Sequence, residues 1–352
     1  MNKNHVCPLA SVAGGRVRER GRAIAKLSAI IAWTLALAWI AIPVFLIADE
    51  PQPPTADMIV VIGAAGAQEY GALFQSWADR WQAAAQRGRA SVTLIGRGEP
   101  PEPSDRERIR EALIDAGRES QRPLWLVLIG HGTFDRKAAR FNLRGPDVSS
   151  SELVEWLQPL TRPIAVIDCS ASSAPFLTAL SAPNRVVITA TKTGGEENFT
   201  RFGEFLAGAI DDPDADLDKD AQTSLWEAYL AASRRTAEFY AADGRLQTEH
   251  ALLDDNGDQQ GTRADIFQGL KLKDDVETID AVDGPLAHQW HLVSSAQDAK
   301  LPPEIRRQRD ELERKILQLR QQKSQFKDDD YFEQLESLLI DLARLNRGPS
   351  QP

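Results

Sequence analysis

The sequence predicts an α/β protein, a three-layer sandwich around a mainly parallel sheet, followed by a C-terminal helical hairpin. Between residues 57 and 190, short apolar runs alternate with amphipathic segments of helical length, the pattern of a parallel sheet with helices on both faces. Over the last fifty residues the pattern changes to leucines and isoleucines three, four and seven positions apart. The chain has 352 residues, 42% of them hydrophobic, which is enough for a sizeable core.

Five apolar runs have the length and composition of buried strands, and they alternate with helical segments. We expect strands at residues 58–62, 92–95, 124–129, 164–167 and 186–189. We expect the intervening helices at residues 70–86, 104–116, 150–160 and 173–180, and two further helices at 199–210 and 224–241. Right-handed crossovers between parallel strands would place these helices on both faces of the sheet.

Two features follow the predicted sheet. Residues 211–220 are rich in aspartate, and such a charge run is usually a solvated loop. Near the C-terminus, two sets of apolar residues share one helical rhythm: Ile305, Leu312, Ile316 and Leu319, then Leu335, Leu338, Leu342 and Leu345. We therefore expect residues 301–347 to form a coiled-coil-like hairpin of two antiparallel helices joined at residues 327–330. The hairpin either packs on the domain or mediates self-association.

The N-terminal region carries the pattern of a membrane anchor. Residues 1–28 contain six lysines and arginines against one glutamate, and residues 29–47, from Ala29 to Ile47, carry no charge. At about 1.5 Å per residue this apolar run spans about 28 Å, close to the ~30 Å core of a bilayer. The preceding basic residues predict a cytoplasmic N-terminus, a single inner-membrane span and an exported, periplasmic body. The alternative is a cleaved signal peptide and a secreted body.

The charge of the exported body indicates which partners it can bind, and its cysteine content indicates whether it can form a disulfide. A linker at residues 48–56 leads into an α/β domain expected at residues 57–300. The whole chain has a net charge of -10 although its N-terminal segment is basic, so the body is acidic and nucleic acid is not expected as a partner. The chain has two cysteines, Cys7 and Cys169. Cys169 is therefore the body's only thiol, and no disulfide can form within the body.

Candidate catalytic side chains follow two of the predicted strands. His131-Gly132 ends the run at residues 124–130, and Asp168-Cys169 ends the run at residues 164–167. Ligands bind at the carboxyl ends of parallel strands, where a thiol and an imidazole would form a nucleophile and a general acid/base. The backbone N–H groups of Gly132 and Cys169 would make an oxyanion hole. The alternative is a buried, inert cysteine and an ordinary turn.

The quoted residues also resemble a known family. IGHG at residues 129–132, VIDC at 166–169 and VVITAT at 186–191 resemble the order and spacing of the legumain and caspase group of cysteine peptidases, as does VVIGAAGAQEYG at 60–71. The resemblance covers about residues 57–262. It implies a caspase-like sheet, with Cys169 as nucleophile, His131 as general acid/base and Gly132 as an oxyanion donor.

The sequence departs from the legumain pattern at the specificity pocket. Ile167-Asp168-Cys169 stands where Glu-Ala-Cys is usual, Ser172 replaces a common glycine, and the expected pocket arginine is not evident. Asp168, Glu196 and Glu197 are acidic candidates for a pocket that takes a basic residue. The alternative for each of them is plain surface charge.

Two functions follow from these features. The first is a membrane-anchored, exported cysteine endopeptidase that hydrolyses peptide or protein substrates through a Cys–His dyad and an acyl-enzyme. The alternative is a catalytically inactive caspase-like interaction or scaffold protein that uses its acidic surface and C-terminal helices. We expect no cofactor and no metal. Residues 252–262 are oxygen-rich but lack the spacing and final glutamate of a calcium loop, and His288 and His291 lack a complete zinc set.

Overall fold

A computed structural model of the chain describes residues 53–99, 102–119, 121–273 and 282–347. The predicted basic segment at residues 1–28 and the apolar segment at residues 29–47 lie outside these residues, as does most of the linker. Among the residues that are described, no helix is both long enough and apolar enough to cross a membrane.

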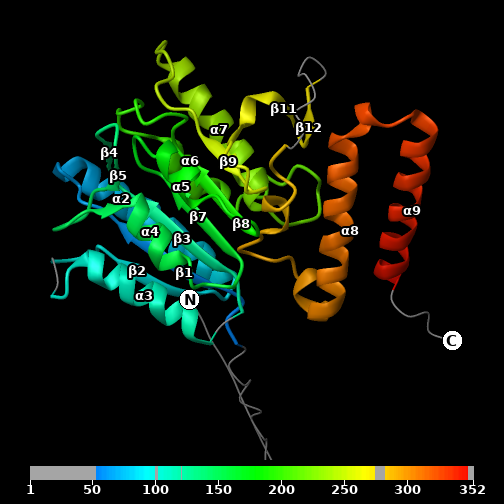
Figure 1. Ribbon diagram of the computed structural model, residues 1–352, viewed down its shortest axis with the longest axis horizontal. Coiled ribbons are helices and arrows are strands. Elements are labelled where there is room, and N and C mark those ends of the chain that lie inside the picture. Colours follow the sequence, from blue (N-terminus) through cyan, green and yellow to red (C-terminus); the bar gives the residue numbers. More distant parts are fainter. Residues whose placement is uncertain (1–52, 100–101, 120, 274–281, 348–352) are drawn as a thin grey trace, which may run out of the picture. The chain divides into compact units, whose positions relative to one another are not determined.

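A seven-stranded sheet forms the centre of the domain, in the order β10-β9-β8-β7-β3-β1-β2 (Figure 1). Its parallel strands are β1 (Asp57–Ile62), β2 (Ser91–Ile95), β3 (Leu124–Ile129), β7 (Ile164–Asp168) and β8 (Arg185–Thr189). At one edge, β9 (Leu252–Asp254) and β10 (Thr262–Arg263) run antiparallel. All five predicted strands are confirmed, and the two edge strands were not predicted.

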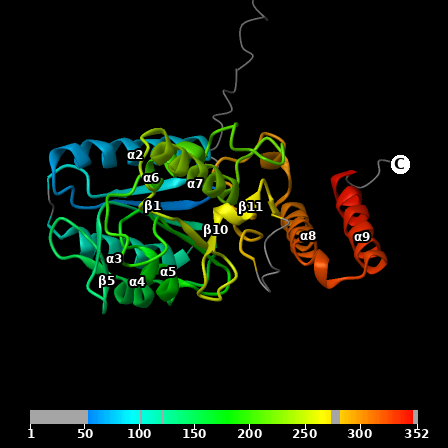
Figure 2. The same ribbon diagram turned by 90° about the horizontal axis from the view of Figure 1, so that it is seen from above.

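Helices cover both faces of the sheet (Figure 2). One face carries α2 (Gln68–Arg87), α6 (Phe202–Ala209) and α7 (Leu225–Ala242). The other carries α3 (Asp105–Glu119), α4 (Ser150–Leu157) and α5 (Ala174–Leu180). The predicted fold class, an α/β three-layer sandwich with a mainly parallel sheet, is confirmed.

Side chains of each central strand alternate between two hydrophobic cores. In β3, Trp125, Val127 and Ile129 join the core under α2, α6 and α7. Leu126 and Leu128 join the core under α3, α4 and α5. Because both faces of β3 are buried, its sequence is a continuous apolar run rather than an alternating one.

Two helices begin at a capping motif that is visible in the sequence. Ser149 precedes α4 and Ser224 precedes α7, and each has a glutamate three positions later. In both cases the serine hydroxyl accepts the backbone N–H of that glutamate, and the glutamate carboxylate accepts the backbone N–H of the serine. Each capping box satisfies donors that the first helical turn leaves free.

Several short elements were not predicted. A small sheet contains β4 (Gly132–Phe134), β5 (Ala139–Phe141) and β6 (Val148–Ser149), and β11 (Phe267–Gln268) pairs with β12 (Lys271–Leu272). Short 3-10 turns are η1 (Ala264–Ile266), η2 (Ala287–Gln289), η3 (Asp298–Lys300) and η4 (Lys323–Gln325). Elements of two or three residues are too short to show a hydrophobic period.

The C-terminal hairpin contains α8 (Pro303–Gln321) and α9 (Asp328–Arg347), which lie side by side (Figures 1 and 2). The predicted connection at residues 327–330 is wrong, because α9 already begins at Asp328. Three aspartates in its first turn are favourable next to the positive end of the helix dipole. Helix α8 also contacts the α/β domain, where Arg309 pairs with Asp298 and the Gln289 amide donates to the Asp310 carbonyl.

Candidate functional site

The strands that carry the two catalytic candidates are neighbours. β3 and β7 pair in parallel, with Leu128 opposite Asp168. The backbone N–H of Cys169 donates to the carbonyl of Leu128 at 2.9 Å. The predicted meeting of these two strand ends at one edge of the sheet is therefore confirmed.

The His131 imidazole lies among aromatic rings. Its centroid is 5.0 Å from that of Tyr70, 5.2 Å from that of Phe74 and 5.9 Å from that of Phe199. Its Nε2 is 3.2 Å from the carbonyl oxygen of Ala65. Since a carbonyl only accepts hydrogen bonds, this contact requires the proton on Nε2 and leaves Nδ1 as the basic nitrogen.

The Cys169 side chain is enclosed in the core on the α2 and α6 side of the sheet. Its exposure is 0%, and a Cβ placed on Gly203 would lie 2.7 Å from Cys169 Cβ and 3.1 Å from its Sγ. Burial raises the pKa of the thiol well above its usual value, and the nearby carboxylates of Asp168 and Glu249 raise it further. Among the hydrogen bonds of the described residues, none joins Cys169 to His131. The thiol is thus held in its protonated form, away from solvent.

The hydroxyl of the next residue, Ser170, lies against the His131-Gly132 turn. A Cβ placed on Gly132 would lie 2.6 Å from Ser170 Oγ and 2.4 Å from the carbonyl oxygen of Ala171. Sequence analysis missed Ser170, although the strand periodicity contained a signal. Ala165 and Ile167 face the α2 side, and the two-residue alternation carries Cys169 to the same buried face.

Asp168 is also buried, with 0% exposure. Its Oδ1 accepts the backbone N–H of Ser170 at 2.9 Å and the Ser170 hydroxyl at 2.6 Å, while its Oδ2 has no hydrogen-bond partner. Burial raises the pKa of Asp168 to about 6. These contacts make Asp168 part of the turn that follows β7.

The two glutamates proposed for the specificity pocket have separate surroundings. Glu196 Oε1 lies 2.6 Å from His250 Nδ1, and Glu196 Oε2 accepts the backbone N–H of Lys192 at 2.9 Å. Glu197 is exposed. The described contacts therefore do not gather Asp168, Glu196 and Glu197 into one pocket.

Ser172 stands at a position that suits glycine. It has a φ of 54°, and its buried hydroxyl has no hydrogen-bond partner. Its backbone N–H donates to the carbonyl of Glu196 at 2.9 Å. Glycine adopts a positive φ without steric cost, which explains why it is suited to this turn.

The oxygen-rich stretch at residues 252–262 folds as a turn that uses its own side chains. Asp254 Oδ1 accepts the backbone N–H of Gly257 at 2.9 Å, and Asn256 Oδ1 accepts that of Asp258 at 2.8 Å. His288 contacts an acid and a hydroxyl, with Nε2 3.3 Å from Asp218 Oδ2 and Nδ1 3.3 Å from Ser224 Oγ.

Comparisons with known proteins give only distant likenesses. No protein-family model and no curated protein matches the sequence. The Drosophila initiator caspase Dronc aligns with a TM-score of 0.40 and 14% identity, over 58% of this chain and 81% of that one. Caspase-1 from Spodoptera frugiperda aligns with a TM-score of 0.37 and 7% identity, over 57% and 86% of the two chains. Protein GSU0716 from Geobacter sulfurreducens aligns with a TM-score of 0.37 and 14% identity, over 52% and 89%. TM-scores this low do not identify an activity.

Proposed function

We propose that this chain is a non-enzymatic, caspase-like interaction protein whose C-terminal hairpin binds a second copy of the chain. In this proposal the predicted apolar segment at residues 29–47 holds the acidic domain at a membrane, on the exported side. The observation that carries the proposal is the enclosure of Cys169 by Gly203 of α6. A catalytic cysteine needs a thiolate that substrate can reach, and burial with a raised pKa opposes both.

The surface available for association is an apolar stripe on α9. Helices α8 and α9 contact each other, and Ile316 and Leu319 of α8 are buried. The apolar surface of α9, here called the α9 stripe, consists of Phe332, Leu335, Leu339, Ile340 and Ala343, and Glu336 lies at the same surface. Phe332 is 55% exposed, and Leu339 and Ile340 are each 42% exposed. A contiguous exposed apolar surface of this kind is typical of a protein-binding site.

The charges of α9 favour a second copy as the partner. The helix starts with Asp328, Asp329 and Asp330 and carries Arg344 near its end, where Arg344 also forms an exposed ion pair with Asp341 at 3.2 Å. If two α9 helices pair antiparallel about a two-fold axis, each acidic start lies beside the basic end of the other, and the stripes meet in the middle. Such an interface uses the same surface on both copies, as two-fold dimers require.

Labelling tests the absence of thiol catalysis. In a Cys7→Ser background, we expect peptidyl electrophiles ending in Arg, Lys, Asn or Asp to leave the native chain unlabelled at neutral pH. Iodoacetamide should react with Cys169 at least about a hundredfold faster after denaturation, because the thiolate is then accessible. Labelling of the native chain that disappears in Cys169→Ala, with the fold intact, would establish a reactive thiol and refute the proposal.

The association is tested by the size of the full-length chain in mild detergent, measured by light scattering. We expect a dimer in the wild type and a monomer in Leu339→Glu/Ile340→Glu, because four carboxylates would be buried in the interface. Ser337→Glu is the matched control, since Ser337 is exposed on α9 but lies outside the α9 stripe. The proposed interface is excluded if the wild type is monomeric, or if all three chains have the same size.

A serine hydrolase is the second candidate function, supported by the place of the Ser170 hydroxyl beside Gly132. Ser170 is 0% exposed, as Cys169 is, so this function also requires the turn after β7 to open. In the described conformation this hydroxyl donates to the carboxylate of Asp168. His131 would have to turn from the Ala65 carbonyl to act as its base. Fluorophosphonate labelling that is lost in Ser170→Ala would favour this function over the interaction protein.

A further inference from the structure

The loop between α6 and α7 contains the spacing of a calcium-binding loop. Residues 216–227 have the sequence DLDKDAQTSLWE, with aspartates at the first, third and fifth positions and glutamate at the twelfth. These are the positions from which a twelve-residue EF-hand loop supplies carboxylates. Sequence analysis treated residues 211–220 as a solvated loop, and so did not connect them with Glu227 in the next helix.

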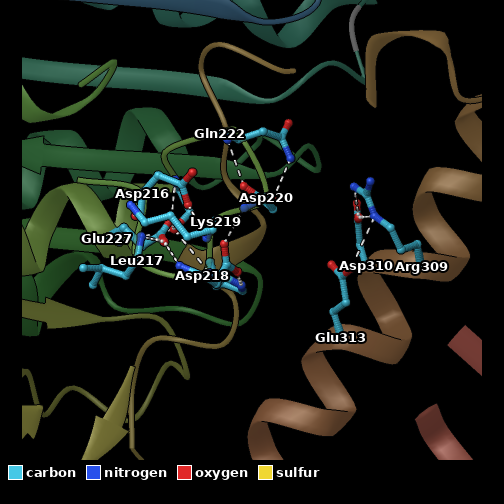
Figure 3. A network of polar contacts seen from close by, with 12 residues as sticks. Asp216, Leu217, Asp218, Lys219, Asp220, Gln222, Glu227, Arg309, Asp310 and Glu313 are labelled. Carbon is cyan, nitrogen blue, oxygen red and sulfur yellow. Dashed lines mark hydrogen bonds and ion pairs between the residues drawn. The ribbon is translucent and has the colours of Figure 1, made fainter. Parts of the chain in front are cut away.

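The fold brings three of these carboxylates together. Oxygen atoms of Asp216, Asp218 and Glu227 all lie within 4.8 Å of one another (Figure 3). Calcium binds oxygen at about 2.3–2.6 Å, so two ligands on opposite sides of one ion can be about 5 Å apart. The cluster has the dimensions that one calcium ion requires.

The burial of two of these carboxylates is a separate observation that points to a cation. Glu227 is 1% exposed and Asp216 is 7% exposed. Glu227 points into the cluster, where its carboxylate accepts the backbone N–H groups of Leu217 and Ser224 and the Ser224 hydroxyl. These donors are neutral, and no ion pair within the described part of the chain joins Glu227 or Asp216 to a basic residue. A buried charge is normally paired with a counter-ion or coordinates a metal.

The nearest basic groups leave the cluster negative. The Lys219 ammonium donates to the backbone carbonyl of Asp216 and not to a carboxylate. Of the three carboxylates, His288 pairs with that of Asp218, at 3.3 Å. On the side of helix α8 that faces the loop, Arg309 pairs with the acids Asp310 and Glu313, at 2.8 and 3.7 Å (Figure 3).

We propose that residues 216–227 bind one calcium ion through the carboxylates of Asp216, Asp218 and Glu227. All of the ligands are oxygens, which suits a hard cation, and calcium accepts the irregular geometry of a loop more readily than magnesium does. The site is separate from the strand ends that carry His131 and Cys169. Calcium would bind the loop to the first turn of α7 and thereby stabilise the folded domain.

Calorimetric titration of the chelator-treated, full-length chain with calcium chloride tests the proposal. We expect one saturable site per chain and a rise of about 5 °C in Tm at saturating calcium. Magnesium chloride at the same concentration should give neither. No saturable calcium heat and no shift in Tm, or equal binding of magnesium, would overturn the calcium assignment.

Three variants test whether calcium binds at these carboxylates rather than to the acidic stretch in general. Glu227→Gln preserves the capping box with Ser224 but removes one carboxylate, and we expect it to weaken calcium binding by about a hundredfold. Ala221 has a φ of 68° at the sixth position, where EF-hand loops carry glycine, so Ala221→Gly should bind calcium at least as tightly as the wild type. Asp214→Asn removes one charge from the same acidic stretch outside the twelve positions and should change nothing. An equal loss in Asp214→Asn and Glu227→Gln would indicate general charge screening and refute the site.

Discussion

Replacing Gly203 with alanine is expected to destabilise the folded chain by about 3 kcal/mol. The added Cβ would lie 2.7 Å from Cys169 Cβ and 3.1 Å from Cζ3 of Trp77, closer than packed carbon atoms come. Because Gly203 lies within α6, alanine by itself would stabilise the helix by up to about 1 kcal/mol. The sign of the effect therefore tells whether the Cys169 side chain points into the core. Denaturant unfolding of the purified chain measures it.

Two further variants complete this experiment. Gly208→Ala in the same helix is the matched control, because its added Cβ would have one neighbour, Arg80 Nη1, at 3.6 Å. We expect that substitution to be neutral or slightly stabilising. Cys169→Gly removes the closest of these contacts, so Gly203→Ala should cost much less in the Cys169→Gly background than in the wild type. A stabilising effect of Gly203→Ala would contradict the described position of Cys169.

The central strands and most helices could be predicted because their sequences carry long-range signals. β3 is apolar throughout because both of its faces are buried, and α7 starts at a serine with a glutamate three positions later. The small sheet β4-β5-β6 gave no such signal, because its strands have only two or three residues each. Its pairing depends on the chain folding back after His131, which is a tertiary property.

The candidate site was predicted less well than the fold, for a reason that lies in the strand geometry. The sequence correctly placed His131 and Cys169 after adjacent strands. Consecutive side chains along a strand point to opposite faces of the sheet. A shift of one residue therefore decides which side chain after β7 faces His131 and Gly132. The structure puts Cys169 in the core and Ser170 beside Gly132. Burial and pKa are consequences of that shift, so they could not be predicted from the motif alone.

Asp283→Asn is expected to remove a pH dependence of stability between about pH 5 and pH 8. Asp283 is 1% exposed and lies beside Asp255, which is 5% exposed. Burial, together with the charge of Asp255, raises the pKa of Asp283 to about 8. In the unfolded chain the same carboxyl ionises near its ordinary pKa of 3.8. Between these values the folded state binds one more proton than the unfolded state.

The sign of the dependence follows from this difference. Stability from the protonated Asp283 is fully present below the unfolded pKa and is lost as pH rises toward the folded pKa, by about 1 kcal/mol per pH unit. Asparagine cannot titrate, yet its side-chain oxygen can still accept the backbone N–H of Asp255 that Asp283 Oδ1 accepts at 2.9 Å. The unfolding free energy of Asp283→Asn, minus that of the wild type, should therefore increase as pH rises. Titrating groups that do not interact with Asp283, such as Asp168, contribute equally to both chains and cancel in the difference, whereas the neighbouring Asp255 titrates together with Asp283 as a pair. Parallel curves of unfolding free energy against pH would mean that Asp283 is ionised in the folded state across this range.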